Sequence, residues 1–186
     1  GTYGAAVVAA GGEALLRGIC PSDLKVPLEE FQKAGAAVDA DEKNRQIRIC
    51  MGKRPLPLLI KTEPYPGFPT DLQSPFMAFL ATAQGTSYIE EQVFEGRFAT
   101  AKILEQMGAV IRTEDQRAVI EGHYPLKGAA VNACDLRGGA ALMVAALAAE
   151  GDTFIGECHH IERGYEDICR DMAALGAHIR WVGKDS

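Results

Sequence analysis

The chain has 186 residues, of which 47% are hydrophobic and 24% charged, so it can bury a sizeable core in one large domain or two small ones. Its net charge of -6 argues against non-specific binding to nucleic acids, which needs a basic surface. The longest alanine-rich apolar stretch, residues 140–149, is too short to cross a bilayer. We therefore expect a cytoplasmic protein that binds neither nucleic acid nor membrane.

The five cysteines are scattered and include no C-x-x-C pair, so reduced thiols are expected rather than a disulfide framework. One of them lies beside His159 and His160, a combination that could suggest a metal site. Adjacent histidines in a strand point in different directions, however, and the sequence has no second cluster of ligands. We predict neither a metal nor another cofactor. The cysteines are Cys20, Cys50, Cys134, Cys158 and Cys169.

The predicted elements follow one recurring order: a helix, a strand, a second helix and a hairpin. The first set has helices at 3–10 and 28–34, a strand at 14–20 and hairpin strands at 37–40 and 46–50. The second set has helices at 71–85 and 98–106, a strand at 86–90 and hairpin strands at 110–112 and 118–121. The third set has helices at 135–151 and 165–174 and strands at 153–156 and 178–182. Leading strands at 58–61 and 129–133 precede the second and third sets.

The glycines that end the two helices of each set indicate three copies of one unit. They lie 23, 23 and 25 residues apart in the three sets, and glycine is the residue that helix C-caps favour. We predict one α/β domain of three repeats, at about 1–52, 53–122 and 123–186. The glycine pairs are Gly12 and Gly35, Gly85 and Gly108, and Gly151 and Gly176.

Both ends of this pattern are incomplete. The first copy has no leading strand, and the third has only one strand of its final hairpin. Because an unpaired edge strand invites a partner, we expect the missing strand to come from chain that is absent here. The distant N-terminus of a longer protein is a plausible source.

A proline-rich loop leads into the helix predicted to start at Asp71. Thr70 and Gln73 have the Thr-x-x-Gln spacing of a capping box, which makes Thr70 the expected N-cap. Asp71 would then lie in the first turn, where unpaired N–H groups and the helix dipole favour an ionised carboxylate. Acidic residues at this position are common and often only stabilise the start of a helix.

The third copy places Asp135 at the equivalent position, with Arg137 close behind it. Arg97 and Arg163 precede the second helices of their own copies. Helix N-termini combined with several arginines are typical of a site for phosphate or carboxylate, although each arginine alone fits a surface salt bridge equally well. The two glycines at 138–139 are expected to let a ligand approach the backbone closely.

Four motifs resemble those of the enolpyruvyl transferase family, in the same order and spacing. The resemblance covers nearly the whole chain, and the combination is highly specific. Related 5-enolpyruvylshikimate-3-phosphate synthases share the repeat architecture but not these motifs. The motifs are Pro66-Gly67-Phe68-Pro69-Thr70-Asp71-Leu72-Gln73, Phe94-Glu95-Gly96-Arg97-Phe98, Asp135-Leu136-Arg137-Gly138-Gly139-Ala140 and His160-Ile161-Glu162-Arg163-Gly164-Tyr165-Glu166.

The resemblance implies a two-domain enzyme whose domains each hold three βαβαββ-type repeats around a pseudo-threefold axis, with helices inside and mixed sheets outside. This chain would be the C-terminal half, inactive without the N-terminal domain. The implied reaction transfers the enolpyruvyl group of phosphoenolpyruvate to the 3-hydroxyl of UDP-N-acetylglucosamine and releases phosphate. That reaction is the first committed step of peptidoglycan synthesis, and hence of building the bacterial cell wall.

The resemblance also implies site residues. Asp71 matches the aspartate that contacts the sugar hydroxyl and acts as general base. Gly96 stands where many relatives have Asn, which puts any side-chain role there in doubt. The family's reactive cysteine, which is the target of fosfomycin, and its catalytic lysine lie in the other domain. The remaining matches are a backbone contact to the UDP-sugar at Val93, phosphoenolpyruvate-binding arginines at Arg137 and Arg163, and further catalytic residues at Arg97 and Asp135.

Two other functions stay open at this point. One is a non-catalytic repeat module that binds a nucleotide-sugar or a protein partner. The other is an enolpyruvyl transferase that acts on a different alcohol.

Overall fold

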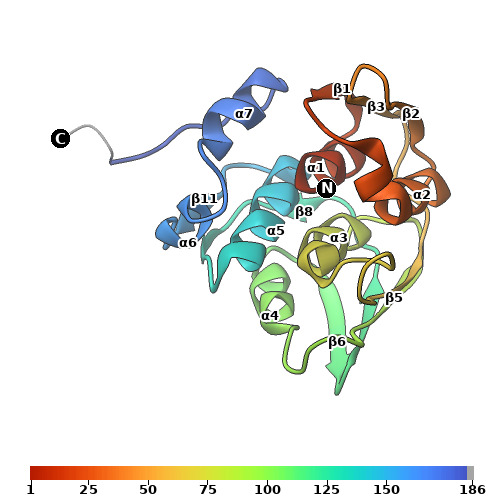
Figure 1. Cartoon of the computed structure of the whole chain (residues 1–186). Coiled ribbons are helices and arrows are strands. Elements are labelled where there is room, and N and C mark those ends of the chain that lie inside the picture. Colours follow the sequence, from red (N-terminus) through yellow and green to blue (C-terminus); the bar gives the residue numbers. More distant parts are fainter. Residues whose placement is uncertain (184–186) are drawn as a thin grey trace.

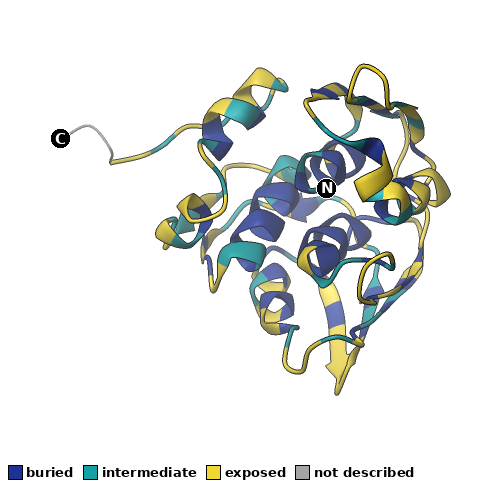
Figure 2. Ribbon diagram, viewed as in Figure 1, coloured by how far each residue is buried: buried dark blue, intermediate teal, exposed yellow. Residues whose placement is uncertain are grey.

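Three helices lie side by side in the middle of the computed structural model, which describes residues 1–183 (Figure 1). They are α1 (Thr2–Ala10), α3 (Gln73–Leu80) and α5 (Leu136–Leu147), and each contacts the other two. Their sequences are apolar on every side rather than along one stripe, as is typical of helices enclosed by a core. Figure 2 shows that all three are buried along most of their length.

The other helices lie around this central group. α2 and α4 are amphipathic and bury only one face, with Phe31 and Leu104 pointing into the core. Two 3-10 turns precede α2 and α3, and the second of them carries Asp71. The bounds are α2 (Lys25–Lys33), α4 (Ala99–Gln106), α6 (His159–Glu162), α7 (Ile168–Ala174), η1 (Pro21–Leu24) and η2 (Thr70–Leu72).

The strands form small sheets on the outside of the helices. The first sheet is antiparallel with the order β1-β3-β2, and the second has the order β4-β5-β7-β6, in which only the β4–β5 pair is parallel. Two further parallel pairs join β8 to β10 and β9 to β11. The strands of the two larger sheets are β1 (Gly12–Arg17), β2 (Ala37–Asp41), β3 (Gln46–Met51), β4 (Leu59–Lys61), β5 (Thr86–Glu90), β6 (Val110–Glu114) and β7 (Arg117–Glu121). Those of the pairs are β8 (Leu126–Lys127), β9 (Ala130–Asn132), β10 (Ala149–Glu150) and β11 (Phe154–Gly156).

The expected fold class is confirmed: helices lie inside and mixed sheets outside. The order helix, strand, helix, hairpin runs from α1 to β3 and again from α3 to β7. The division into repeats at 1–52, 53–122 and 123–186 stays a prediction, and residues 184–186 of the last repeat lie outside the described residues. In the part of the chain that the structure describes, no helix is long and apolar enough to cross a membrane.

Several predicted boundaries are wrong. The helix expected at 71–85 begins as the η2 turn and is regular only in α3, while the helix expected at 165–174 is regular only in α7. The helix expected at 135–151 ends at Leu147, and the short strand β10 follows it. Residues 178–182, predicted as a strand, are irregular. An alternating apolar pattern favours a strand, but the strand forms only where a neighbouring strand shares its backbone hydrogen bonds.

Four phenylalanines anchor the loop that carries Asp71. Phe76 of α3 stacks on Phe31 of α2 with ring centroids 4.8 Å apart. Phe68 contacts the Phe76 ring edge-on, with centroids 4.7 Å apart. Phe79 contacts the Phe76 ring edge-on, with centroids 4.8 Å apart. Such aromatic contacts add directional preference to the burial of apolar area. Because Phe68 lies three residues before Asp71, this cluster fixes where the η2 turn sits relative to α3.

Replacing Phe76 with alanine should lower the free energy of unfolding by about 3–5 kcal/mol, because its fully buried ring would leave a cavity. Chemical denaturation followed by circular dichroism measures this change. The control is Phe154→Ala, at a ring that is 60% exposed, which should cost less than about 1 kcal/mol. Equal losses at the two positions would contradict the assignment of Phe76 to the core.

Candidate functional site

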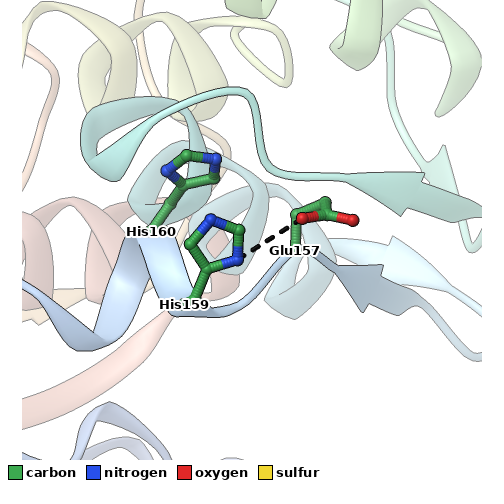
Figure 3. Close-up of side chains that lie close together, drawn as sticks. All are labelled: Glu157, His159 and His160. Atoms are coloured by element: carbon green, nitrogen blue, oxygen red, sulfur yellow. Dashed lines mark ion pairs between the residues drawn. The ribbon is translucent and has the colours of Figure 1, made fainter.

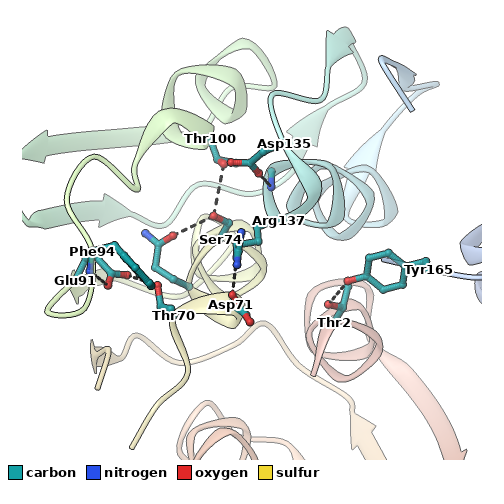
Figure 4. A network of polar contacts seen from close by, with 12 residues as sticks. Thr2, Thr70, Asp71, Ser74, Glu91, Phe94, Thr100, Asp135, Arg137 and Tyr165 are labelled. Carbon is teal, nitrogen blue, oxygen red and sulfur yellow. Dashed lines mark hydrogen bonds and ion pairs between the residues drawn. The ribbon is translucent and has the colours of Figure 1, made fainter. Parts of the chain in front are cut away.

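The N-terminal ends of the central helices meet on one side of the molecule (Figure 4). Arg137, in the first turn of α5, donates from Nε to Oδ1 of Asp71 in η2 at 2.5 Å. The Asp71 side chain is 66% exposed and that of Arg137 is 34% exposed. This ion pair joins residues from the second and third predicted repeats, as the sequence motifs suggested. It leaves the second oxygen of Asp71 open to a ligand from solvent.

Asp135 caps α5. Its Oδ1 accepts a hydrogen bond from the backbone N–H of Gly138 at 2.6 Å, which satisfies one of the unpaired donors at the start of the helix. The carboxylate also acts on its neighbour, because burial and then the Asp135 charge raise the pKa of the Cys134 thiol. The structure therefore gives Asp135 a structural function at the helix end, close to Arg137.

Thr70 does not cap α3, so the predicted capping box is wrong. Its hydroxyl donates to Glu91 Oε2 at 2.9 Å, and Leu72, which has no capping side chain, occupies the N-cap position of α3. Gln73, the other expected member of the box, is buried. It accepts a hydrogen bond from Ser74 Oγ at 3.0 Å, while its Nε2 has no partner among the described residues. The proline-stiffened loop holds Thr70 away from the helix N–H groups and against the β5 end instead.

The loop between β5 and α4 supplies Val93 and Arg97. The Arg97 guanidinium lies over the exposed ring of Phe94, 4.3 Å from its centroid, in a cation–π contact. The backbone N–H of Val93 donates to Glu91 Oε1 at 3.0 Å. An internal bond therefore occupies this N–H, so the carbonyl is the backbone group of Val93 that can face a ligand.

Glu91 is the residue that sequence reasoning missed. It is 1% exposed, and its carboxylate accepts hydrogen bonds from Thr62, Thr70, Val93 and Phe94. A signal was present in the sequence, because Ser87, Ile89 and Glu91 alternate along β5 and its extension and point to the buried side. A carboxylate that continues an inward-facing row is buried and therefore needs hydrogen-bond donors around it, which indicates a structural function.

Arg163 is exposed at the C-cap of α6, where it forms no ion pair with any described residue. Packing of Gly164 against the Leu136 side chain nevertheless brings the segment of Arg163 close to that of Arg137. A Cβ added to Gly164 would lie 2.7 Å from Cδ1 of Leu136, the residue before Arg137. The next residue, Tyr165, shares a hydrogen bond of 2.8 Å with Thr2 at the start of α1 (Figure 4). Burial raises the pKa of Tyr165, and the nearby charge of Asp71 adds to the effect.

Gly138 and Gly139 serve packing inside the chain, which is a correction to the expected ligand approach. A Cβ on Gly138 would lie 2.6 Å from Cys134 Sγ, and one on Gly139 would collide with Ile161 of α6. Both glycines are buried. They let α5 lie close to the loop before it and to α6, the helix that Arg163 follows.

The sequence argument against a metal site at the paired histidines assumed that they lie in a strand, and this assumption is wrong. His159 and His160 lie in α6 rather than in a strand, and their ring centroids are 4.0 Å apart (Figure 3). Glu157 Oε2 lies 3.4 Å from His159 Nδ1, and the three ligand atoms lie within 4.8 Å of one another. Imidazole and carboxylate groups can hold a divalent transition metal, but Glu157 and His159 are exposed, and such contacts are common on protein surfaces without a metal.

Comparison with known proteins identifies the family to which the chain belongs. The model of the EPSP synthase (3-phosphoshikimate 1-carboxyvinyltransferase) family matches residues 1–172. The chain belongs to this family. Two curated relatives are both UDP-N-acetylglucosamine 1-carboxyvinyltransferases. The one from Desulfofundulus thermocisternus is 45% identical over 96% of this chain and 73% of its own length. The one from Nitrobacter winogradskyi is 42% identical over 98% of this chain and 42% of its own length.

Solved structures of the EPSP synthase family agree with the fold. The enolpyruvyl transferase NikO from Streptomyces tendae has a TM-score of 0.84 and 28% identity, over 96% of this chain and 43% of its own. EPSP synthase from Acinetobacter baumannii has a TM-score of 0.71 and 19% identity, over 98% and 43%, which supports the fold alone. The chain thus spans less than half the length of most of these family members.

Replacing Asp135 with alanine should lower the free energy of unfolding by about 0.5–2 kcal/mol, because the first turn of α5 loses its cap. Asp135→Asn keeps an acceptor at the same position and should lower the free energy of unfolding by only about a few tenths of 1 kcal/mol. Urea denaturation of the two variants beside the unmodified protein measures both values. Equal losses would mean that the charge, and not the cap, provides the stabilisation.

Proposed function

We propose that this chain forms part of a UDP-N-acetylglucosamine 1-carboxyvinyltransferase. That enzyme would transfer the enolpyruvyl group of phosphoenolpyruvate to the 3-hydroxyl of the UDP-sugar in peptidoglycan synthesis. The observation that carries the proposal is the Asp71–Arg137 pair, which sets a carboxylate beside an arginine where helix N-termini meet. The names of the relatives at 42% and 45% identity support the choice of substrates.

The geometry suits the binding of an anionic substrate. Phosphoenolpyruvate carries a carboxylate and a phosphate, and guanidinium groups bind both through charge-assisted hydrogen bonds. Arg137 and Arg163 lie on adjoining segments held together by Gly139 and Gly164, and Arg97 lies on the loop that follows β5. The positive ends of the α3 and α5 dipoles add to the attraction for an anion.

Asp71 would act as the base. It would take the proton of the attacking hydroxyl as the sugar oxygen bonds to the carbon that carries the phosphate, while the electron pair of the double bond takes up a proton at the methylene carbon. The methylene carbon then loses a proton, the double bond re-forms, and the bond to the phosphate oxygen breaks, so that phosphate leaves with the electron pair of that bond. The arginines would stabilise the negative charge that develops on the leaving group. Asp135 would hold Arg137 in place through the cap of α5.

The chain would need a partner domain for turnover. In the proposed enzyme, an N-terminal domain provides the reactive cysteine, the catalytic lysine and most contacts to uridine. None of the five cysteines here is assigned a catalytic function. Cys134, the cysteine next to Asp135, has a raised pKa, the opposite of what an activated thiol needs.

A complete enzyme that contains this chain should release phosphate from phosphoenolpyruvate only when UDP-N-acetylglucosamine is present. A phosphate-release assay with this acceptor, and separately with 3-phosphoshikimate, distinguishes the acceptors. Release with 3-phosphoshikimate or another alcohol, but not with the UDP-sugar, would overturn the proposed substrate. No release with any acceptor would favour a binding module.

In the same complete enzyme, Asp71→Asn should lower kcat by about 10²–10⁴-fold, because an amide cannot accept the hydroxyl proton. The control is Asp115→Asn, in the exposed turn between β6 and β7, which should leave kcat unchanged. Steady-state kinetics with both substrates give the values. Near-normal turnover by a folded Asp71→Asn enzyme would remove Asp71 as the base.

A further inference from the structure

Glu91 carries a buried carboxylate that holds three segments together, and Figure 4 shows it beside Thr70 and Phe94 of two of them. Its Oε1 accepts from the Thr62 hydroxyl at 2.8 Å and from the backbone N–H groups of Val93 at 3.0 Å and Phe94 at 3.1 Å. Its Oε2 accepts from the Thr70 hydroxyl at 2.9 Å. The Thr62 hydroxyl in turn accepts from the backbone N–H of Gln92 at 2.8 Å.

This arrangement suits a carboxylate in particular. A buried charge is costly unless it is hydrogen-bonded, and a carboxylate offers only acceptor sites. All four groups around Glu91 can act as donors, so a carboxylate can accept a hydrogen bond from each of them. Charge-assisted bonds of this kind are stronger than those between neutral groups, and the result is a rigid junction rather than a loose contact.

Two of the three segments carry predicted site residues. Thr70 directly precedes Asp71 in η2, so its bond to Glu91 fixes the turn that presents the base. Val93 and Phe94 belong to the loop that leads to Arg97, and the Phe94 ring supports the Arg97 guanidinium at 4.3 Å. One buried side chain therefore links the base on one side of the site to the arginine loop on the other.

We infer that Glu91 is a positioning residue, which sets the distance between Asp71 and the Val93–Arg97 loop and so aligns the sugar hydroxyl with the phosphoenolpyruvate. The inference rests on the proposed function. Glu91 itself is buried beneath the loop and touches no substrate. Its effect passes through Thr70 on one side and through the amides of Val93 and Phe94 on the other.

The kinetic test uses the complete enzyme with Glu91→Gln and Thr70→Val. Glutamine keeps the size but loses the charge, and valine removes only the link to the Asp71 turn. Because small misplacements of reacting groups are costly, Glu91→Gln should lower kcat by on the order of 10²-fold. Thr70→Val should lower kcat by a smaller factor and leave KM for phosphoenolpyruvate unchanged.

The matched control is Glu90→Gln. Glu90 is the preceding residue, but it lies on the other face of β5, where it pairs with Lys61 at 3.1 Å. This variant should keep both kcat and KM. If Glu90→Gln and Glu91→Gln lower kcat equally, a general effect of charge rather than the junction would be responsible, and the inference would be overturned.

A double variant separates positioning from simple stabilisation of the fold. If Glu91 acts through Asp71, adding Glu91→Gln to Asp71→Asn should cost less than about twofold more in kcat, because the base is already lost. Full additivity of the two losses would contradict the inference. So would a Glu91→Gln enzyme that keeps normal kcat and KM.

Hydrogen exchange gives a readout that does not depend on activity. In Glu91→Gln, the amides of Val93 and Phe94 and the segment around Thr70 should exchange faster, while β1–β3 should not change. Unchanged exchange in the loop overturns the inference. If the unmodified enzyme releases no phosphate, the proposed function fails, and exchange alone then decides whether Glu91 holds these segments.

Discussion

The burial of α1, α3 and α5 governs the rest of this structure. Because the three helices are apolar on every side, no part of their length can face water without a large loss of hydrophobic stabilisation. The sheets therefore have to lie outside them, and side chains that do chemistry can appear only near the helix ends. The N-terminal ends are the favourable ones for anions, since unpaired N–H groups and the dipoles point there. The position of the candidate site is a consequence of how the core is built.

Charge at these helix ends is organised by contacts across the chain rather than within one segment. Asp71 pairs with Arg137, which follows it by 66 residues. Asp135 stabilises the helix that presents Arg137, and Glu91 ties the turn of Asp71 to the loop of Arg97. Each acidic group thus has its own physical task, namely pairing, capping or linking. The sequence alone does not distinguish these tasks, because all three residues are acidic.

The sequence allowed the fold class and most elements to be predicted, because hydrophobic periods and glycine stops are local signals. The sequence also brought Asp71 and Arg137 into one site, because Asp71 and Asp135 hold equivalent positions and Arg137 closely follows Asp135. Prediction from the sequence failed where a contact with a residue distant in the sequence determines the local structure. Thr70 turns to Glu91 instead of capping a helix, and residues 178–182 are irregular despite an apolar alternation. The alternation along β5 indicates that Glu91 faces the buried side, but its donors lie up to 29 positions away, and no local pattern identifies them.

The contact between Gly139 and Ile161 has a consequence for how the site can vary. Among the described residues, no hydrogen bond or ion pair joins Arg137 to Arg163; the missing side chains of Gly139 and Gly164 allow their segments to approach. How closely these segments approach therefore depends on the fit of the two glycines against the side chains of Ile161 and Leu136. In the proposed enzyme, affinity for a doubly charged ligand would then be sensitive to positions that carry no functional group. A survey restricted to charged and polar residues would overlook both glycines.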